Sequence, residues 1–130
     1  MVACSDLAAP LGLYSHVSRV KSGNTIYIAG QVGVDAQGNL VGPGDFAAQM
    51  RQTFVNLDIA LEAAGGSFAD VAKFTTYITR DTDLPAFMET RKAIFAQIYP
   101  KGDYPPNTLL VISRLVKPEL LIEIEAIAAV

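Results

Sequence analysis

The fold is decided by residues 45–79, which read DFAAQMRQTFVNLDIALEAAGGSFADVAKFTTYIT. After Asp45, which can cap a helix start, apolar side chains recur at helical spacing until Gly65-Gly66, a usual signal for a helix end. This spacing predicts a helix with one apolar face. The opposite, polar face carries Gln49, Arg51, Gln52, Asp58 and Glu62. Residues 71–79 alternate and are rich in Thr, Tyr, Phe and Ile, which predicts a strand.

A second helix and two strands are predicted downstream of this segment. Asp81-Thr82-Asp83 forms a turn, Asp83 caps the helix, and Pro85 lies in the first helical turn, where its missing N–H costs nothing. The helix ends at Pro100 and Gly102. Its apolar spacing runs through Leu84, Phe87, Met88, Arg91, Phe95 and Ile98. The strands cover residues 108–115 and 121–130.

Upstream, residues 16–29 contain β-branched and aromatic residues on both sides of Ser22-Gly23-Asn24, a turn cluster, which predicts a hairpin. The predicted order is therefore strand, strand, helix, strand, helix, strand, strand, in a single domain over residues 1–130. A chain of this length removes roughly two-thirds of its unfolded surface from water. The fold class is α+β, with one mixed sheet and both helices on one face.

The sheet face away from the helices needs a cover. In the strand predicted over residues 108–115, Leu110 and Ile112 point to one side and Leu109 and Val111 to the other, so both sides are mainly apolar. No third helix is predicted, so the simplest cover is another copy of the chain. The pattern therefore predicts a closed homo-oligomer.

The composition excludes several classes of protein. The 130 residues are 51% hydrophobic and 18% charged, which excludes disorder. Lys and Arg number 10 against 13 Asp and Glu, for a net charge of -3, and no basic run is present, so nucleic acid is not expected as a partner. No apolar stretch approaches the ~20 residues that cross a bilayer, and the amino terminus lacks signal-peptide features, so no membrane association is expected. With Cys4 as the single cysteine, a reducing, cytoplasmic location is expected.

Few residues offer catalytic chemistry. One His and one Cys, without HExxH or CxxC spacing, argue against a metal site, and no Walker loop or GxGxxG is present, so no nucleotide cofactor is expected. His16 is interpreted as a surface or hydrogen-bonded histidine. The remaining candidates are Glu123 and Glu125, which alternation places on one face of the last strand, ~7 Å apart. They form an ordinary solvated acidic face or, where a neighbouring subunit encloses one of them, a general acid or base of raised pKa.

Short segments along most of the chain match a known protein family in order and spacing. They are Gly12-Leu13-Tyr14-Ser15, Ala29-Gly30-Gln31, Gln52, Asn56-Leu57, Leu61-Glu62-Ala63-Ala64-Gly65, Asp70-Val71, Lys73, Thr75-Thr76-Tyr77-Ile78 and Ile122-Glu123-Ile124-Glu125-Ala126-Ile127-Ala128. Through them the chain resembles the RidA (YjgF) family of small trimeric enamine/imine deaminases. The resemblance implies a chorismate-mutase-like unit that forms a homotrimer with a central barrel, with a ligand pocket at each subunit interface.

The resemblance also implies a reaction. Deaminating members of the family hydrolyse reactive imines such as 2-iminopropanoate to a keto acid and ammonia, without a metal or organic cofactor. By this resemblance Glu123 matches the acid that positions or deprotonates the attacking water, Tyr14 lines the pocket, and Gly30 offers backbone contacts. Glu125 is implied to be structural.

The sequence departs from the family pattern in the substrate pocket. Asn107 stands where the family's deaminases carry an arginine that pairs with the substrate carboxylate, and such a pair is worth roughly 10- to 100-fold in binding. Leu109 replaces a common cysteine and Met88 the usual asparagine, so a more apolar substrate-binding pocket is predicted. Arg91 and Arg114 are alternative cations, although both are more typical of surface positions.

Two functions follow from these residues. The leading hypothesis is a cofactor-free hydrolase of imines or enamines that differ in shape or charge from the usual small imino acids, with Glu123 as catalytic residue. The alternative is a non-catalytic trimer that binds a small metabolite or a protein partner in the same clefts. A ribonuclease activity, also attributed to the superfamily, is disfavoured because the chain has neither a catalytic histidine pair nor a basic groove.

Overall fold

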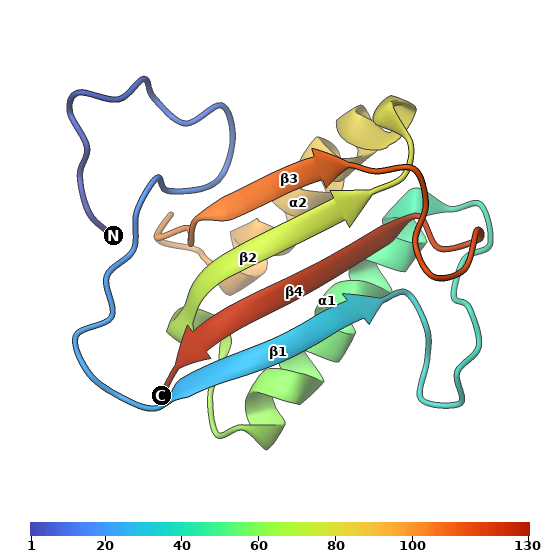
Figure 1. Ribbon diagram of the computed structural model, residues 1–130, viewed down its shortest axis with the longest axis horizontal. Helices are drawn as coiled ribbons and strands as arrows, with labels where there is room; N and C mark the ends of the chain where they lie inside the picture. The colour runs from blue at the N-terminus through green and yellow to red at the C-terminus, as the bar shows by residue number, and fades with distance from the viewer.

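One four-stranded sheet and two helices form the core of the computed structural model, which describes residues 1–130 (Figure 1). The elements are β1 (Thr25–Val32), α1 (Phe46–Ala63), β2 (Val71–Ile78), α2 (Leu84–Ile98), β3 (Asn107–Val111) and β4 (Ile122–Ala129). The strands lie in the order β1-β4-β2-β3; β4 is antiparallel to both neighbours, and β3 is parallel to β2. Both helices cover the same sheet face (Figure 1). The predicted α+β class with a mixed sheet is therefore confirmed.

Both helices begin where the sequence predicts. At the start of α1 the Asp45 carboxylate accepts a hydrogen bond from the Ala48 N–H at 3.0 Å, and after its end Gly65 adopts a φ of +81°. At the start of α2 the expected side-chain cap by Asp83 is wrong: its carboxylate pairs with Arg80 at 2.7 Å instead. Neither helix is long and apolar enough to cross a membrane.

The hairpin predicted over residues 16–29 is wrong in its first half. Its turn exists, because Gly23 has a φ of +122°, but only β1 follows it as a strand. The preceding segment leaves the edge of β1, since the Ser18 hydroxyl donates to the Ala72 carbonyl at 2.5 Å, near the start of β2. A contact 54 positions away in the sequence thus decides where this segment lies.

The strand predicted over residues 108–115 is shorter than expected. Its partner β2 ends at Ile78, and the last bond between them runs from the Ile112 N–H to the Ile78 carbonyl at 2.8 Å. Beyond this point no backbone is available for pairing, so β3 ends at Val111.

Gln49 was predicted on the polar face of α1 but is fully buried. Its Nε2 donates to the carbonyls of Gly42 and Glu119 at 3.3 and 3.2 Å, and its Oε1 accepts from the Leu121 N–H at 2.9 Å. The side chain therefore provides hydrogen-bond partners for backbone groups of two loops and of Leu121, the residue that precedes β4. Asn56 does the same for β1, donating to the carbonyls of Val32 and Val34 at 2.8 and 2.9 Å.

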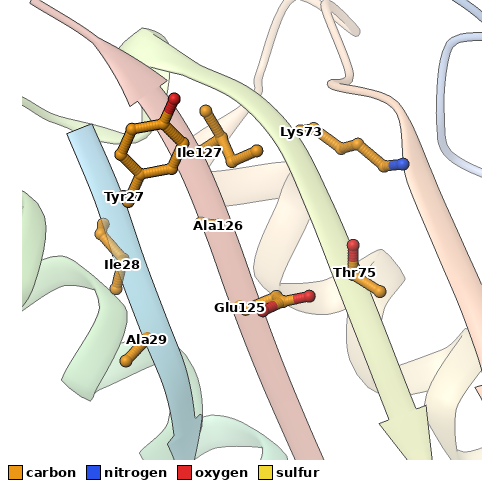
Figure 2. A pocket seen from close by; sticks show the side chains of 8 residues that line it. All are labelled: Tyr27, Ile28, Ala29, Lys73, Thr75, Glu125, Ala126 and Ile127. Carbon is orange, nitrogen blue, oxygen red and sulfur yellow. The ribbon is translucent and has the colours of Figure 1, made fainter. Parts of the chain in front are cut away.

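The sheet face opposite the helices is uncovered. It carries the apolar side chains of Tyr27, which is 78% exposed, and Ile127, its cross-strand partner. A hollow of about 360 Å³ lies on this face, and Lys73, Thr75 and Glu125 also line it. Figure 2 shows the side chains of its lining residues. An apolar surface of this kind is typical of an interface between protein chains.

Candidate functional site

The six residues predicted for the site divide into two groups on opposite faces of the sheet. Tyr14, Met88, Asn107 and Leu109 line one cavity on the helix side. Glu123 and Gly30 lie together elsewhere, with the Glu123 side chain on the uncovered face. Within one protomer the structure thus brings the predicted residues together in two separate groups.

Glu123 reaches the uncovered face because strand side chains alternate. Its neighbours Ile122 and Ile124 are buried against the helices, whereas Glu123 is half-buried and accepts no hydrogen bond within the chain. Desolvation, together with the nearby charge of Glu125, raises the pKa of Glu123 above its ordinary value. The side chain is therefore a carboxyl group without a partner in the chain, whose environment holds its pKa above the ordinary value.

Gly30 provides the space that the Glu123 side chain occupies. It lies at the irregularity in the pairing of β1 with β4, between Ile28 and Gln31. A Cβ at position 30 would come within 2.6 Å of the Glu123 Cδ and 2.8 Å of its Cγ. Any larger residue at this position would displace the carboxyl group. Gly30 therefore affects the site by determining where the Glu123 side chain lies.

Glu125 differs from Glu123 because it has a partner. The Tyr77 hydroxyl donates to its Oε1 at 3.0 Å, and this bond, with smaller contributions from burial and the two acidic side chains, raises the pKa of Tyr77. The acidic pair is therefore asymmetric. One carboxylate is held by a hydrogen bond, and the other is available for a ligand or water.

The cavity on the helix side has a volume of about 260 Å³. Asn107 is oriented in it by the Thr76 hydroxyl, which donates to Oδ1 at 2.8 Å, and Tyr14 by the Leu11 N–H, which donates to the phenol oxygen at 3.2 Å. Its lining residues are Leu11, Gly12, Tyr14, Met88, Arg91, Asn107 and Leu109. The wall is mainly apolar, with a few oriented polar groups, as is usual for small-molecule sites.

Arg91 is buried rather than on the surface, contrary to the sequence interpretation. It is 4% exposed and lines the cavity, because it lies on the same stripe of α2 as Phe87 and Phe95. Arg114 is exposed; it donates to the carbonyls of Leu115 and Val116 and does not line the cavity. The sequence did carry a signal that Arg91 is buried, because Arg91 falls within the apolar periodicity of α2. In the prediction, the general preference of arginine for the surface outweighed that signal.

The remaining titratable candidates lie outside both groups. His16 has its Nε2 at 2.6 Å from the Ala8 carbonyl, as a hydrogen-bonded histidine does, and Cys4 is a free thiol near the amino terminus. No cluster of three or more His, Cys, Asp or Glu side chains that could hold a metal ion is present. The two groups of predicted residues, with Arg91, present carboxyl, amide, phenol and guanidinium side chains.

The raised pKa of Glu123 predicts a pH-dependent gain in stability for Glu123→Gln. Folding favours the protonated acid, so the wild type loses stability as the pH rises through the folded-state pKa. The variant has no charge to bury, so we expect its unfolding midpoint to exceed that of the wild type at pH 7 and to approach it near pH 4. Differential scanning calorimetry at both pH values measures this.

The matched control for this measurement is Glu125→Gln. It weakens the charge-assisted bond from the Tyr77 hydroxyl, so it should bring no such gain. An equal gain at pH 7 in both variants would mean that general relief of negative charge, rather than the environment of Glu123, is responsible.

Comparisons with known proteins agree with this fold over nearly the whole chain. The family model described as Endoribonuclease L-PSP matches residues 5–130. A RutC family protein of Pyrococcus horikoshii is 38% identical over 119 residues, which cover 92% of this chain and 88% of that protein. The 2-iminobutanoate/2-iminopropanoate deaminase of Escherichia coli K12 is 34% identical over 120 residues, or 92% of this chain and 91% of the enzyme.

A solved structure gives the same result. The crystal structure of YyfB, a conserved Rid family protein of Yersinia pestis, superposes with a TM-score of 0.87 at 35% identity, covering 99% of this chain and 96% of that one. Sequence and fold thus agree over the same residues, and the chain belongs to the RidA (YjgF) family, whose family model bears the description Endoribonuclease L-PSP.

Proposed function

We propose that this protein is a cofactor-free hydrolase that converts imines or enamines to a carbonyl compound and ammonia. The observation that carries the proposal is Glu123, a carboxyl group with a raised pKa, no hydrogen-bond partner in the chain, and a glycine that makes room for it. The family supports the reaction class, because relatives such as the Escherichia coli protein are named 2-iminobutanoate/2-iminopropanoate deaminase.

In the proposed reaction Glu123 carries both protons of the attacking water to nitrogen, one after the other. The ionised carboxylate accepts the first proton while the water oxygen bonds to the imine carbon, and it passes this proton to the imine nitrogen, which gives a neutral carbinolamine. The carboxylate then takes the hydroxyl proton and delivers it to nitrogen as the carbon–nitrogen bond breaks and the carbonyl forms. Ammonia leaves. A pKa raised toward the working pH suits a group that must both accept and return a proton.

The proposed substrate differs in shape from the usual small imino acids. Met88 and Leu109 add apolar surface to the helix-side cavity, and Asn107 contributes an amide rather than a charge. These side chains favour a substrate whose substituent is more apolar than that of the usual small imino acids.

The proposed active site lies between subunits of a homotrimer. Within one protomer, Glu123 and the cavity around Tyr14 and Asn107 lie on opposite faces of the sheet, so one small ligand does not contact both. In the proposed trimer a neighbouring protomer covers the open face, and the ligand can then contact residues of two protomers. The exposed Tyr27 and Ile127 support such contact. No cofactor, nucleic acid or membrane takes part in this proposal.

Because the proposed trimer covers the open face, we expect a charge introduced on this face to dissociate the assembly. Light scattering of the wild type should give three times the chain mass of 13.9 kDa. Ile127→Glu introduces a charge into the proposed interface and should give monomers. The control Ile59→Glu, on the exposed side of α1, should stay trimeric. A monomeric wild type would contradict the assembly, and so would an unchanged mass for Ile127→Glu.

The reaction is tested with imines generated in place. An amino-acid oxidase releases imines from small, branched and aromatic amino acids, and semicarbazide traps what remains unhydrolysed. We expect the wild type to speed imine loss, most for substrates with apolar side chains. No acceleration with any imine, accompanied by ligand-induced thermal stabilisation, would instead support the non-catalytic binding protein.

A further inference from the structure

Arg91 is a buried cation without a counter-charge. It is 4% exposed and forms no ion pair with any acidic residue. Its one hydrogen bond runs from Nη2 to the Met88 sulfur at 3.3 Å, a weak acceptor, and its Nε is buried with no partner. The Phe87 ring, 4.8 Å from Cζ, gives only partial compensation.

Such an arrangement is costly unless something else compensates the charge. Buried ions in proteins are normally paired, and a guanidinium remains protonated at neutral pH. Burial lowers the pKa of Arg91, partly offset by the nearby Tyr14, which is the response of a cation that lacks a carboxylate partner. The free protein therefore holds a positive charge that an incoming anion would neutralise.

The cavity beside Arg91 can hold that anion. The guanidinium lies so close to Gly12 that a Cβ there would collide with Nη2. Across the cavity the Asn107 Oδ1 is occupied by the Thr76 hydroxyl, which leaves the Nδ2 hydrogens as free donors. A guanidinium and an amide that line one small cavity form a donor set suited to a carboxylate.

We propose that Arg91 binds the carboxylate of the substrate, with the Asn107 Nδ2 as second donor, and so determines specificity for imino acids with an apolar side chain. The inference rests on the proposed function, because that function is the reason to expect an imine group on the substrate. One guanidinium neutralises one charge, which favours a carboxylate over a doubly charged phosphate. A cavity of about 260 Å³ with Leu11, Met88 and Leu109 in its wall limits the substituent to a few carbons. The charge absent at position 107 is thus supplied from α2.

The test measures binding of a stable carboxylate without turnover. Isothermal titration calorimetry compares 2-oxobutanoate, a product of the proposed reaction, with the uncharged 2-butanone. We expect the wild type to bind the oxo acid at least 10-fold more tightly than the ketone. Arg91→Met should weaken oxo-acid binding about 10- to 100-fold and leave ketone binding unchanged. The control Arg114→Met, which alters an exposed arginine, should bind like the wild type.

A second variant keeps the test decisive if Arg91→Met does not fold. Gly12→Ala introduces a methyl group against Nη2 without altering α2, and it should weaken oxo-acid binding in the same direction. A folded Arg91→Met protein should unfold at no lower temperature than the wild type, because an apolar side chain replaces an uncompensated charge. Equal affinity of the wild type and Arg91→Met for the oxo acid would overturn the inference, as would a wild type that does not distinguish acid from ketone.

The two proposals fail in different ways. Binding of the oxo acid through Arg91 without hydrolysis of any imine would remove the proposed function and leave the carboxylate site standing. Imine hydrolysis with the same KM in the wild type and Arg91→Met would remove the carboxylate site and leave the proposed function standing.

Discussion

Glu123→Gln should hydrolyse imines about 10²- to 10⁴-fold more slowly than the wild type, the range that a positioned general base contributes. Glutamine preserves the shape of the side chain beside Gly30 but cannot accept a proton from water. The effect should appear in kcat, since the variant leaves the Arg91 cavity on the other face of the sheet intact. The oxidase-coupled assay with semicarbazide gives the rates directly.

Glu125→Gln serves as the matched control for this rate. It changes the carboxylate two positions away, which is already bonded to the Tyr77 hydroxyl, and it should retain most of the activity. Light scattering of both variants checks that the assembly is unchanged. Equal rates for Glu123→Gln and the wild type would exclude Glu123 as the base, and with it the proposed mechanism.

Gln49→Leu should destabilise the fold by about 3 kcal/mol or more. The substitution leaves the carbonyls of Gly42 and Glu119 and the N–H of Leu121 without their partner, and each unsatisfied buried group costs ~1–3 kcal/mol. This is a large part of the ~5–15 kcal/mol that stabilises an ordinary domain. Urea unfolding monitored by circular dichroism should show a lower midpoint.

Gln97→Leu makes the same chemical change on the exposed side of α2, where no hydrogen bond of the glutamine is lost. Its free energy of unfolding should stay within about 0.5 kcal/mol of the wild type. Similar losses in both variants would show that the buried bonds of Gln49 contribute little, and that the loops they join are held by other contacts.

The sequence predicts best those elements whose local signals agree with one another. The long helix α1 combines apolar periodicity with Asp45 at one end and Gly65 at the other, and its boundaries are nearly as expected. The hairpin before β1 was wrong because the Ser18 bond to Ala72 joins residues far apart in the chain. Local residue preference carries no information about such a contact.

The two buried polar side chains illustrate the same difficulty. Both helices were predicted, but residue type suggested exposure for Gln49 and Arg91, and both are buried. Gln49 is buried because two loops and β4 converge on it, and Arg91 because residues 11–14 lie over α2. Neither of these tertiary contacts can be predicted from the periodicity of the sequence.

The candidate site was predictable only in part. Strand alternation alone places Glu123 and Glu125 on one face, whereas the nearness of Tyr14, Met88, Asn107 and Leu109 was implied by family resemblance and depends on the packing of three separate segments. These groups lie on two faces because Glu123 alternates with the buried Ile122 and Ile124, whereas Asn107 and Leu109 point to the helix side; periodicity within one strand does not relate its faces to those of another strand.

The placement of Glu123 and the cavity on opposite faces of the sheet has an evolutionary consequence. Substitutions at positions 88, 107 and 109 change the wall of the cavity without touching the residues that pack around Glu123. Selection can therefore exchange the accepted ligand in small steps while the proposed proton-transfer group is inherited unchanged. Divergence of ligand preference among paralogues with a common reaction is what such a separation favours.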